Sequence, residues 1–348
     1  MTKSNPGRFF EDFRVGETIR HATPRTVTAA DTSLNIALTG GRYALFCADP
    51  VAQAAGFTRA PIDPLLVFHI VFGKTVPDIS LNAVANLGYA EGRFLVPVYP
   101  GDTLSAQSDV IGLKQNSSGK TGVVTVRTRG VNQRNETVLT YVRWVMVNKR
   151  ELSAPAPAPV NPHLADFVSP NDLVLPAGLD FSGYDFALAG SPHAFEDYAI
   201  GERIDHVDGM TLEEAEHQLA TRLYQNTAKV HFDNLAQQGT RFGKRLVYGG
   251  VAISLARALA FNGLGNAALM LAINAGRHVN PLFAHDTLYA WSQVLDTADL
   301  GAAGALRLRL VALKNQNAHA FTDRAEGGDY AEHVVLDFDY WAAIPKRG

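Results

Sequence analysis

An internal repeat constrains the fold of this 348-residue chain more than any other feature. The segment FEDFRVGE at 10–17 returns 185 positions later as FEDYAIGE at 195–202. The Gly-Arg pair, the proline and the Asp-Thr-Leu of 92–104 return 184 positions later in 276–288. Because two signatures that lie far apart keep nearly the same offset, the chain contains two copies of one structural unit.

The sequence patterns of the two copies predict the same order of helices and strands. A short strand with the Gly-Glu pair comes first, and a long apolar helix follows over about 63–75 in one copy and 250–262 in the other. Several strands come next, as in the Val- and Thr-rich segments 121–131 and 137–147. Segment 306–314 alternates leucine with arginine, which is typical of a strand with one buried face. The pattern therefore predicts a helix followed by an antiparallel meander, twice.

A further helix is expected just before the apolar helix of the second copy. Thr211 and Glu214 have the spacing of a capping box, which predicts that a helix begins there. The apolar residues after it recur at helical spacing and predict its buried face; they are Leu212, Ala215, Leu219 and Leu223.

The two copies are separated by a segment of different composition. Residues 153–162 (SAPAPAPVNP) alternate alanine with proline, so they favour neither a helix nor a central strand and act as a semi-rigid spacer. We therefore expect an N-terminal domain at 1–150, a linker at 151–193 and a C-terminal domain at 194–348.

Composition excludes several classes of function. The net charge of −3 gives no general attraction to nucleic acid or to an anionic membrane. The single cysteine, Cys47, rules out an internal disulfide framework and fits a reducing cytoplasm. The N-terminus has no apolar signal core, and no 18-residue apolar span occurs. The sequence also lacks a phosphate loop and a Cys/His metal cluster, so we expect a cytoplasmic protein with no metal and no cofactor.

The candidate catalytic residues lie in the second copy. Asn226 and His231 are five positions apart at the end of a helical run, where polar side chains can converge. Gly249 and Gly250 then begin the long apolar helix. Free N–H groups at a helix start suit a developing oxyanion, and a proton-transfer residue beside them allows chemistry next to a carbonyl.

This motif resembles the MaoC-like hydratase/dehydratase family, whose pattern is Gly-Asp-x-Asn-Pro-x-His followed by a His-Gly pair. On this chain the family's catalytic aspartate falls on Asn226, its histidine on His231 and its oxyanion glycine on Gly249, with Tyr248 in place of the second histidine. The resemblance implies an α+β double hotdog, in which each of two tandem domains wraps a curved antiparallel sheet around a long helix.

The first copy has lost the residues that this chemistry needs. Gly41 stands opposite Asn226 and Phe46 opposite His231, and neither transfers a proton. Pro64 stands opposite Gly249 and has no N–H. We therefore expect one active site per chain at the seam between the copies, with the first copy shaping the pocket for the acyl group and coenzyme A, as the resemblance implies.

The residues suggest a division of roles. His231 is suited to both proton steps near neutral pH, whereas Asn226 can orient water but cannot act as a base. Asp233 is either a replacement carboxylate, a partner that orients the imidazole or a solvated loop acid. Several cations are candidates for binding the substrate carboxylate or the coenzyme A phosphates; they are Lys229, Arg245, Arg277 and Arg42.

Three stretches resemble the mesaconyl-CoA hydratases in particular: residues 9–21, 38–43 and 224–232. This resemblance implies hydration of an enoyl-CoA whose acyl group carries its own carboxylate, which a neutral Asn226 does not repel. The alternatives are an (R)-specific hydratase acting on another acyl-CoA, a hotdog thioesterase and a non-catalytic acyl-CoA-binding module. Hotdog proteins tend to pair their sheets, so a homodimer is expected.

Overall fold

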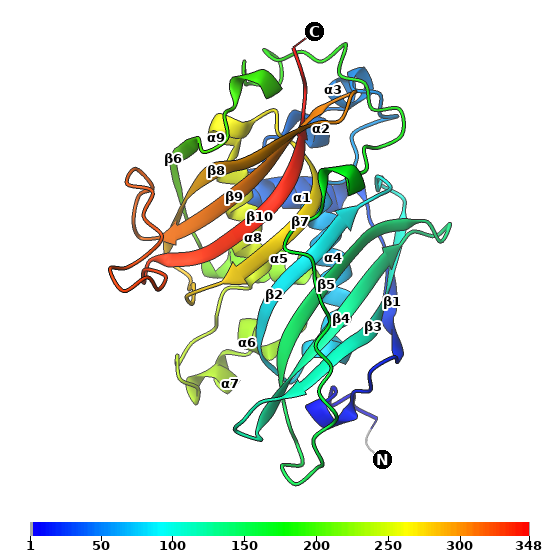
Figure 1. The fold of residues 1–348 in the computed structure, drawn as a ribbon, viewed down its shortest axis with the longest axis vertical. Helices are drawn as coiled ribbons and strands as arrows, with labels where there is room; N and C mark the ends of the chain where they lie inside the picture. The colour runs from blue at the N-terminus through cyan, green and yellow to red at the C-terminus, as the bar shows by residue number, and fades with distance from the viewer. Residues whose placement is uncertain (1–2, 348) are drawn as a thin grey trace.

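A single antiparallel sheet of ten strands organises the computed structural model, which describes residues 3–347. Its strand order is β1-β3-β4-β5-β2-β7-β10-β9-β8-β6, so each half contributes five strands and β2 pairs with β7 at the centre (Figure 1). The strands of the first half are β1 (Thr18–Thr26), β2 (Ala83–Phe94), β3 (Thr103–Gln115), β4 (Thr121–Val131) and β5 (Thr137–Asn148). Those of the second half are β6 (Arg203–Thr211), β7 (Leu269–His278), β8 (Thr287–Asp299), β9 (Gly304–Lys314) and β10 (Val334–Ile344).

Helices precede the meander in each half, in the order that the repeat predicts. The first half has α1 (Ala29–Thr39), α2 (Ala44–Cys47), α3 (Asp49–Ala54) and α4 (Pro64–Thr75). The second half has α5 (Glu214–Leu223), α6 (Lys229–Phe232), α7 (Asn234–Gln238), α8 (Gly249–Leu259) and α9 (Phe261–Leu264). The repeated Phe-Glu-Asp forms one 3-10 turn in each half, Phe10–Asp12 and Phe195–Asp197.

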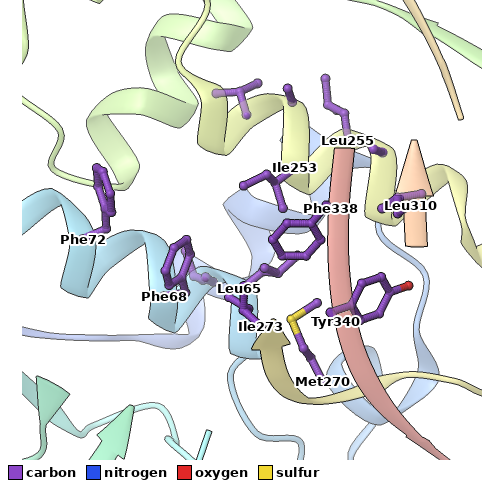
Figure 2. Close-up of a cluster of buried hydrophobic side chains, with 14 of the residues drawn as sticks. Leu65, Phe68, Phe72, Ile253, Leu255, Met270, Ile273, Leu310, Phe338 and Tyr340 are labelled. Atoms are coloured by element: carbon purple, nitrogen blue, oxygen red, sulfur yellow. The ribbon is translucent and has the colours of Figure 1, made fainter. Parts of the chain in front are cut away.

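The core lies between the sheet and the two long apolar helices. All twelve residues of α4 are buried, and so are residues 250–259 of α8. Figure 2 shows Phe68 of α4 and Ile253 of α8 pointing toward the same cluster, which Phe338 of β10 completes from the sheet. Burial of this much apolar surface is the main force that holds the two halves together.

The segment between the halves is packed against the protein. It crosses the face of the sheet opposite the helices (Figure 1). Val160 pairs with Leu113 in an isolated bridge, and the Trp341 indole donates to the Val168 carbonyl at 3.0 Å. The proline-rich spacer therefore adopts an extended path that the sheet surface holds in place.

The predicted start and buried face of α5 are wrong in part. Thr211 is the last residue of β6, and its hydroxyl pairs with that of Thr287, so it does not cap the helix. Leu219 is 37% exposed, whereas His217 and Thr221 are buried. Leu212 and Leu223 are buried as predicted, whereas Ala215 is exposed. Apolar spacing misses the polar part of the buried face, where the Thr221 hydroxyl donates to the His217 carbonyl.

Candidate active site

The start of α8 offers two open backbone donors. Tyr248 is the N-cap residue, and the N–H groups of Gly249 and Gly250 have no hydrogen-bond partner within residues 3–347. Close packing requires glycine at both positions. A Cβ on Gly249 would lie 2.3 Å from His278 Cε1, and one on Gly250 would lie 2.8 Å from His69 Nδ1. The helix start therefore presents free N–H groups to an anion.

The equivalent helix start in the first half is closed. Pro64 occupies the first turn of α4 and has no N–H, as the sequence predicts. The Asp63 carboxylate caps the helix by accepting from Leu65 N at 2.7 Å, and burial raises the pKa of Asp63 to about 6. The first half thus satisfies its own helix terminus, while the second half leaves its terminus open.

The His231 imidazole is held with one nitrogen free. It lies in the single turn α6, where Nδ1 donates to the Leu246 carbonyl at 3.0 Å. Nε2 has no partner within the described part of the chain and remains accessible. Burial lowers the pKa of His231 to about 4, with a smaller contribution from nearby His217 and against the effect of the Leu246 hydrogen bond. The lowered pKa leaves His231 neutral near pH 7, and because Nδ1 carries the hydrogen, the proton-accepting lone pair is on Nε2.

Asn226 is buried and fixed by the turn that follows α5. Its Oδ1 accepts from Ala228 N at 2.9 Å, which identifies the oxygen of the amide. Its Nδ2 has no partner among residues 3–347 and is accessible. Asn226 therefore offers N–H donors to a ligand, while its oxygen holds the loop.

The first half clamps the loop that carries Asn226. A Cβ on Gly73 of α4 would lie 1.9 Å from the Tyr224 carbonyl oxygen, so only glycine allows this approach. Lys74 donates to Gln225 Oε1 at 3.1 Å, and Arg25 donates to the Leu223 carbonyl. The half without the motif therefore positions the residues that precede Asn226.

Besides Gly250, two further residues were expected as possible support, Asp233 and Tyr248, and neither hydrogen-bonds to His231. Asp233 is exposed and caps α7 by accepting from Ala236 N at 2.9 Å, so the imidazole of His231 is oriented by Leu246 instead. The Tyr248 hydroxyl is buried without a partner within residues 3–347, and its ring lies 5.3 Å from that of His231. Tyr248 thus forms one wall beside the imidazole.

The structure does not gather the four candidate cations at one place. Lys229, Arg277 and Arg42 are exposed, and Arg42 stacks 4.6 Å over the ring of Phe261. Arg245 is half-buried and forms an ion pair with Glu214. None of the four contacts Asn226 or His231 through a hydrogen bond in the described part of the chain.

Several residues at the seam were not predicted. His69 of α4 and Ser254 of α8 occupy equivalent repeat positions and bond to each other, with 2.9 Å between His69 Nε2 and Ser254 Oγ. The Tyr224 hydroxyl donates to Ser254 Oγ at 3.1 Å. Tyr89 of β2 pairs with His278 of β7 at 3.2 Å. The repeat offset relates His69 to Ser254, but it does not predict how the two copies meet.

The described residues contain no cluster of three or more His, Cys, Asp or Glu that could bind a metal ion. Within residues 3–347, no helix has both the length and the apolar character needed to cross a bilayer.

Comparisons with known proteins show what the whole chain is similar to. The family model described as mesaconyl-CoA hydratase matches residues 2–326. A mesaconyl-CoA hydratase from Cereibacter sphaeroides is 62% identical over 347 residues, which cover 99% of this chain and 100% of the relative. A β-methylmalyl-CoA dehydratase from Chloroflexus aurantiacus is 59% identical over 349 residues, with 99% of each chain covered.

Solved structures confirm the fold class. A MaoC domain protein dehydratase from Chloroflexus aurantiacus matches with a TM-score of 0.98 at 59% identity and covers 100% of both chains. A Mycobacterium tuberculosis protein described as a double hotdog matches with a TM-score of 0.77 at 26% identity, covering 97% of this chain and 98% of its own. The predicted α+β double hotdog is therefore confirmed.

Proposed function

The chain belongs to the mesaconyl-CoA hydratase family and is a hydro-lyase, and we propose that it catalyses the reversible hydration of mesaconyl-C1-CoA (2-methylfumaryl-CoA) to erythro-β-methylmalyl-CoA. The observation that supports this proposal most strongly is local. A neutral histidine with a free Nε2 lies beside a helix start whose first two N–H groups are unpaired. This arrangement suits water addition next to a thioester carbonyl.

His231 carries the protons in the proposed reaction. Its Nε2 takes a proton from water as the water oxygen bonds to the β-carbon of the substrate. The electron pair of the double bond moves toward the thioester, whose oxygen gains enolate charge. The same proton then passes from His231 to the α-carbon, so the imidazole ends neutral, and dehydration reverses each step.

Gly249 N–H stabilises the enolate oxygen. It lies at the start of an eleven-residue helix, where the helix dipole adds to the hydrogen bond. Removing one such donor typically lowers the rate by on the order of 10²–10³. Gly250 N–H lies one residue further along the same turn.

Asn226 positions the water in this proposal. Because its oxygen already accepts from Ala228 N, the free Nδ2 donates to the water oxygen or to the substrate carboxylate. A neutral amide leaves that carboxylate without a repelling charge, whereas the aspartate of the wider family would carry one.

Turnover of defined thioesters tests the proposal. Mesaconyl-C1-CoA and crotonyl-CoA are compared by loss of enoyl-thioester absorbance, while a thiol reagent follows free coenzyme A. We expect a higher kcat/KM for mesaconyl-C1-CoA and no thiol release. Faster hydration of crotonyl-CoA would identify a hydratase for another acyl group. Release of thiol would identify a thioesterase, and tight binding without turnover a binding module.

A further inference from the structure

His278 lies at the same helix start as the proposed oxyanion donor. It is the last residue of β7, and its ring packs across the α-carbon of Gly249. A Cβ on Gly249 would lie 2.3 Å from His278 Cε1 and 2.6 Å from its Nδ1. The side chain is half-buried, so part of the ring remains accessible.

The repeat places a phenylalanine of the first half opposite each of His231 and His278. Both histidines are replaced by phenylalanine in the first half, where Phe94 stands opposite His278 and Phe46 opposite His231. Together with Pro64, the counterpart of Gly249, these two phenylalanines line one small apolar cavity of about 40 Å³. Three positions that meet around one cavity in the first half therefore carry His231, Gly249 and His278 in the second.

One histidine with a structural role is retained in both halves. His21 and His206 are repeat equivalents, and both are retained. Each bonds through Nε2 to an equivalent serine at 2.8 Å, Ser108 in the first half and Ser292 in the second. This serine-bonded histidine is thus present in both copies, whereas His231 and His278 occur only in the copy with the open helix start.

Tyr89 determines which nitrogen of His278 carries the hydrogen. Its hydroxyl lies 3.2 Å from His278 Nε2 and has no other hydrogen-bond partner among residues 3–347. If Nε2 were the donor, the buried hydroxyl hydrogen of Tyr89 would be left without an acceptor, which is costly. Tyr89 therefore donates, Nε2 accepts, and Nδ1 of His278 carries the hydrogen.

The Nδ1–H of His278 is a free donor in the site. Nδ1 has no partner within the described residues and is accessible, whereas Nδ1 of His69 is fully buried. Burial lowers the pKa of His278 to about 4, with a further contribution from nearby His231, so the ring is neutral near pH 7. A neutral imidazole N–H can polarise a carbonyl oxygen without needing to ionise.

We propose that His278 Nδ1–H is a second donor to the thioester oxygen, so that it forms the oxyanion hole together with Gly249 N–H. Tyr89, which comes from the first half, is the positioning residue that holds His278 in the donating tautomer. This inference rests on the proposed function, because it assigns a further catalytic residue to the same thioester chemistry.

Kinetics of His278 variants form the first part of the test. His278→Phe places the first half's own residue, Phe94, at the equivalent position of the second half. We expect kcat for mesaconyl-C1-CoA to fall on the order of 10²–10³ with KM changed little. His278→Gln retains an N–H donor, so its kcat should be at least about tenfold higher than that of His278→Phe. The matched control is His163→Phe, at an exposed histidine of the segment between the halves, and it should behave as wild type.

Vibrational spectroscopy separates the oxyanion hole from proton transfer. Mesaconyl-C1-CoA labelled with ¹³C at the thioester carbonyl is bound to His231→Ala, which is expected not to turn it over. We expect the carbonyl stretch to move to lower frequency than in free substrate, and to return part of the way in His231→Ala/His278→Phe. Equal frequencies in the two variants, or wild-type kcat in His278→Phe, would overturn the inference.

Nitrogen NMR of labelled histidine checks the tautomer. We expect His278 to carry its hydrogen on Nδ1 in the wild type and to become a mixture of tautomers in Tyr89→Phe. A hydrogen on Nε2 of His278 in the wild type would contradict the proposed geometry. If wild type does not hydrate mesaconyl-C1-CoA at all, the proposed function fails, whereas the tautomer result still decides the hydrogen-bond assignment.

Discussion

At the scale of single residues, the sequence indicates which side chains form the candidate site but not which groups hold them in place. The spacing of Asn226 and His231 singles out both. The structure adds that Asn226 Oδ1 accepts a hydrogen bond from Ala228 N. It also shows that the Leu246 carbonyl fixes the tautomer of His231. No sequence signal indicates these partners, because any residue supplies a backbone N–H or carbonyl. The same limit explains why Asp233 was an open candidate for the orienting role.

Replacement of Asn226 by aspartate is the sharpest test at this scale. Asn226→Asp keeps the acceptor for Ala228 N, so the loop should fold unchanged. It removes the Nδ2 donors and places a negative charge beside an anionic substrate. We expect kcat/KM for mesaconyl-C1-CoA to fall about 10- to 100-fold, the effect of losing a hydrogen bond to a charged or reacting group. Activity at or above wild type would show that the neutral amide is not needed.

At the scale of elements, the long helices are predicted well because their composition is uniform. Segments 63–75 and 250–262 are largely apolar, which is typical of buried helices, and they become α4 and α8, although α8 ends at Leu259. The short helix α6 was not predicted, since a single turn has too few residues to show a period. The contact of α4 with the 223–226 loop was also missed, because the pattern of one half carries no information about the other.

Gly73→Ala tests that contact. The added methyl group would overlap the Tyr224 carbonyl and push the loop away from α4. We expect a loss of about 1–3 kcal/mol in the free energy of unfolding, typical of overpacking, and a lower kcat although Gly73 lies outside the motif. Chemical denaturation and steady-state kinetics measure the two effects. Gly327→Ala is the matched control because a Cβ there meets nothing within 4 Å, and equal behaviour of the two variants would contradict the clamp.

At the scale of the whole molecule, the repeat predicts two copies of one unit but not their placement. Pairing of β2 with β7 joins the copies into one sheet and brings Tyr89 to His278. The two copies differ at equivalent positions around the start of the long helix. The first has a capped helix start at Asp63 and an apolar cavity, while the second has free N–H groups and two accessible histidines. We infer that duplication allowed one half to keep the chemistry and the other to support it.

The central claim is that each chain has one active site and that His231 carries its protons. The most direct measurement is turnover of mesaconyl-C1-CoA by wild type and His231→Ala in parallel, with folding checked by thermal unfolding. The account predicts rapid loss of enoyl-thioester absorbance in wild type. In the variant, kcat should be lower by about 10²–10⁴-fold, the usual contribution of general acid–base catalysis. A folded His231→Ala protein that keeps most of the activity would contradict the account.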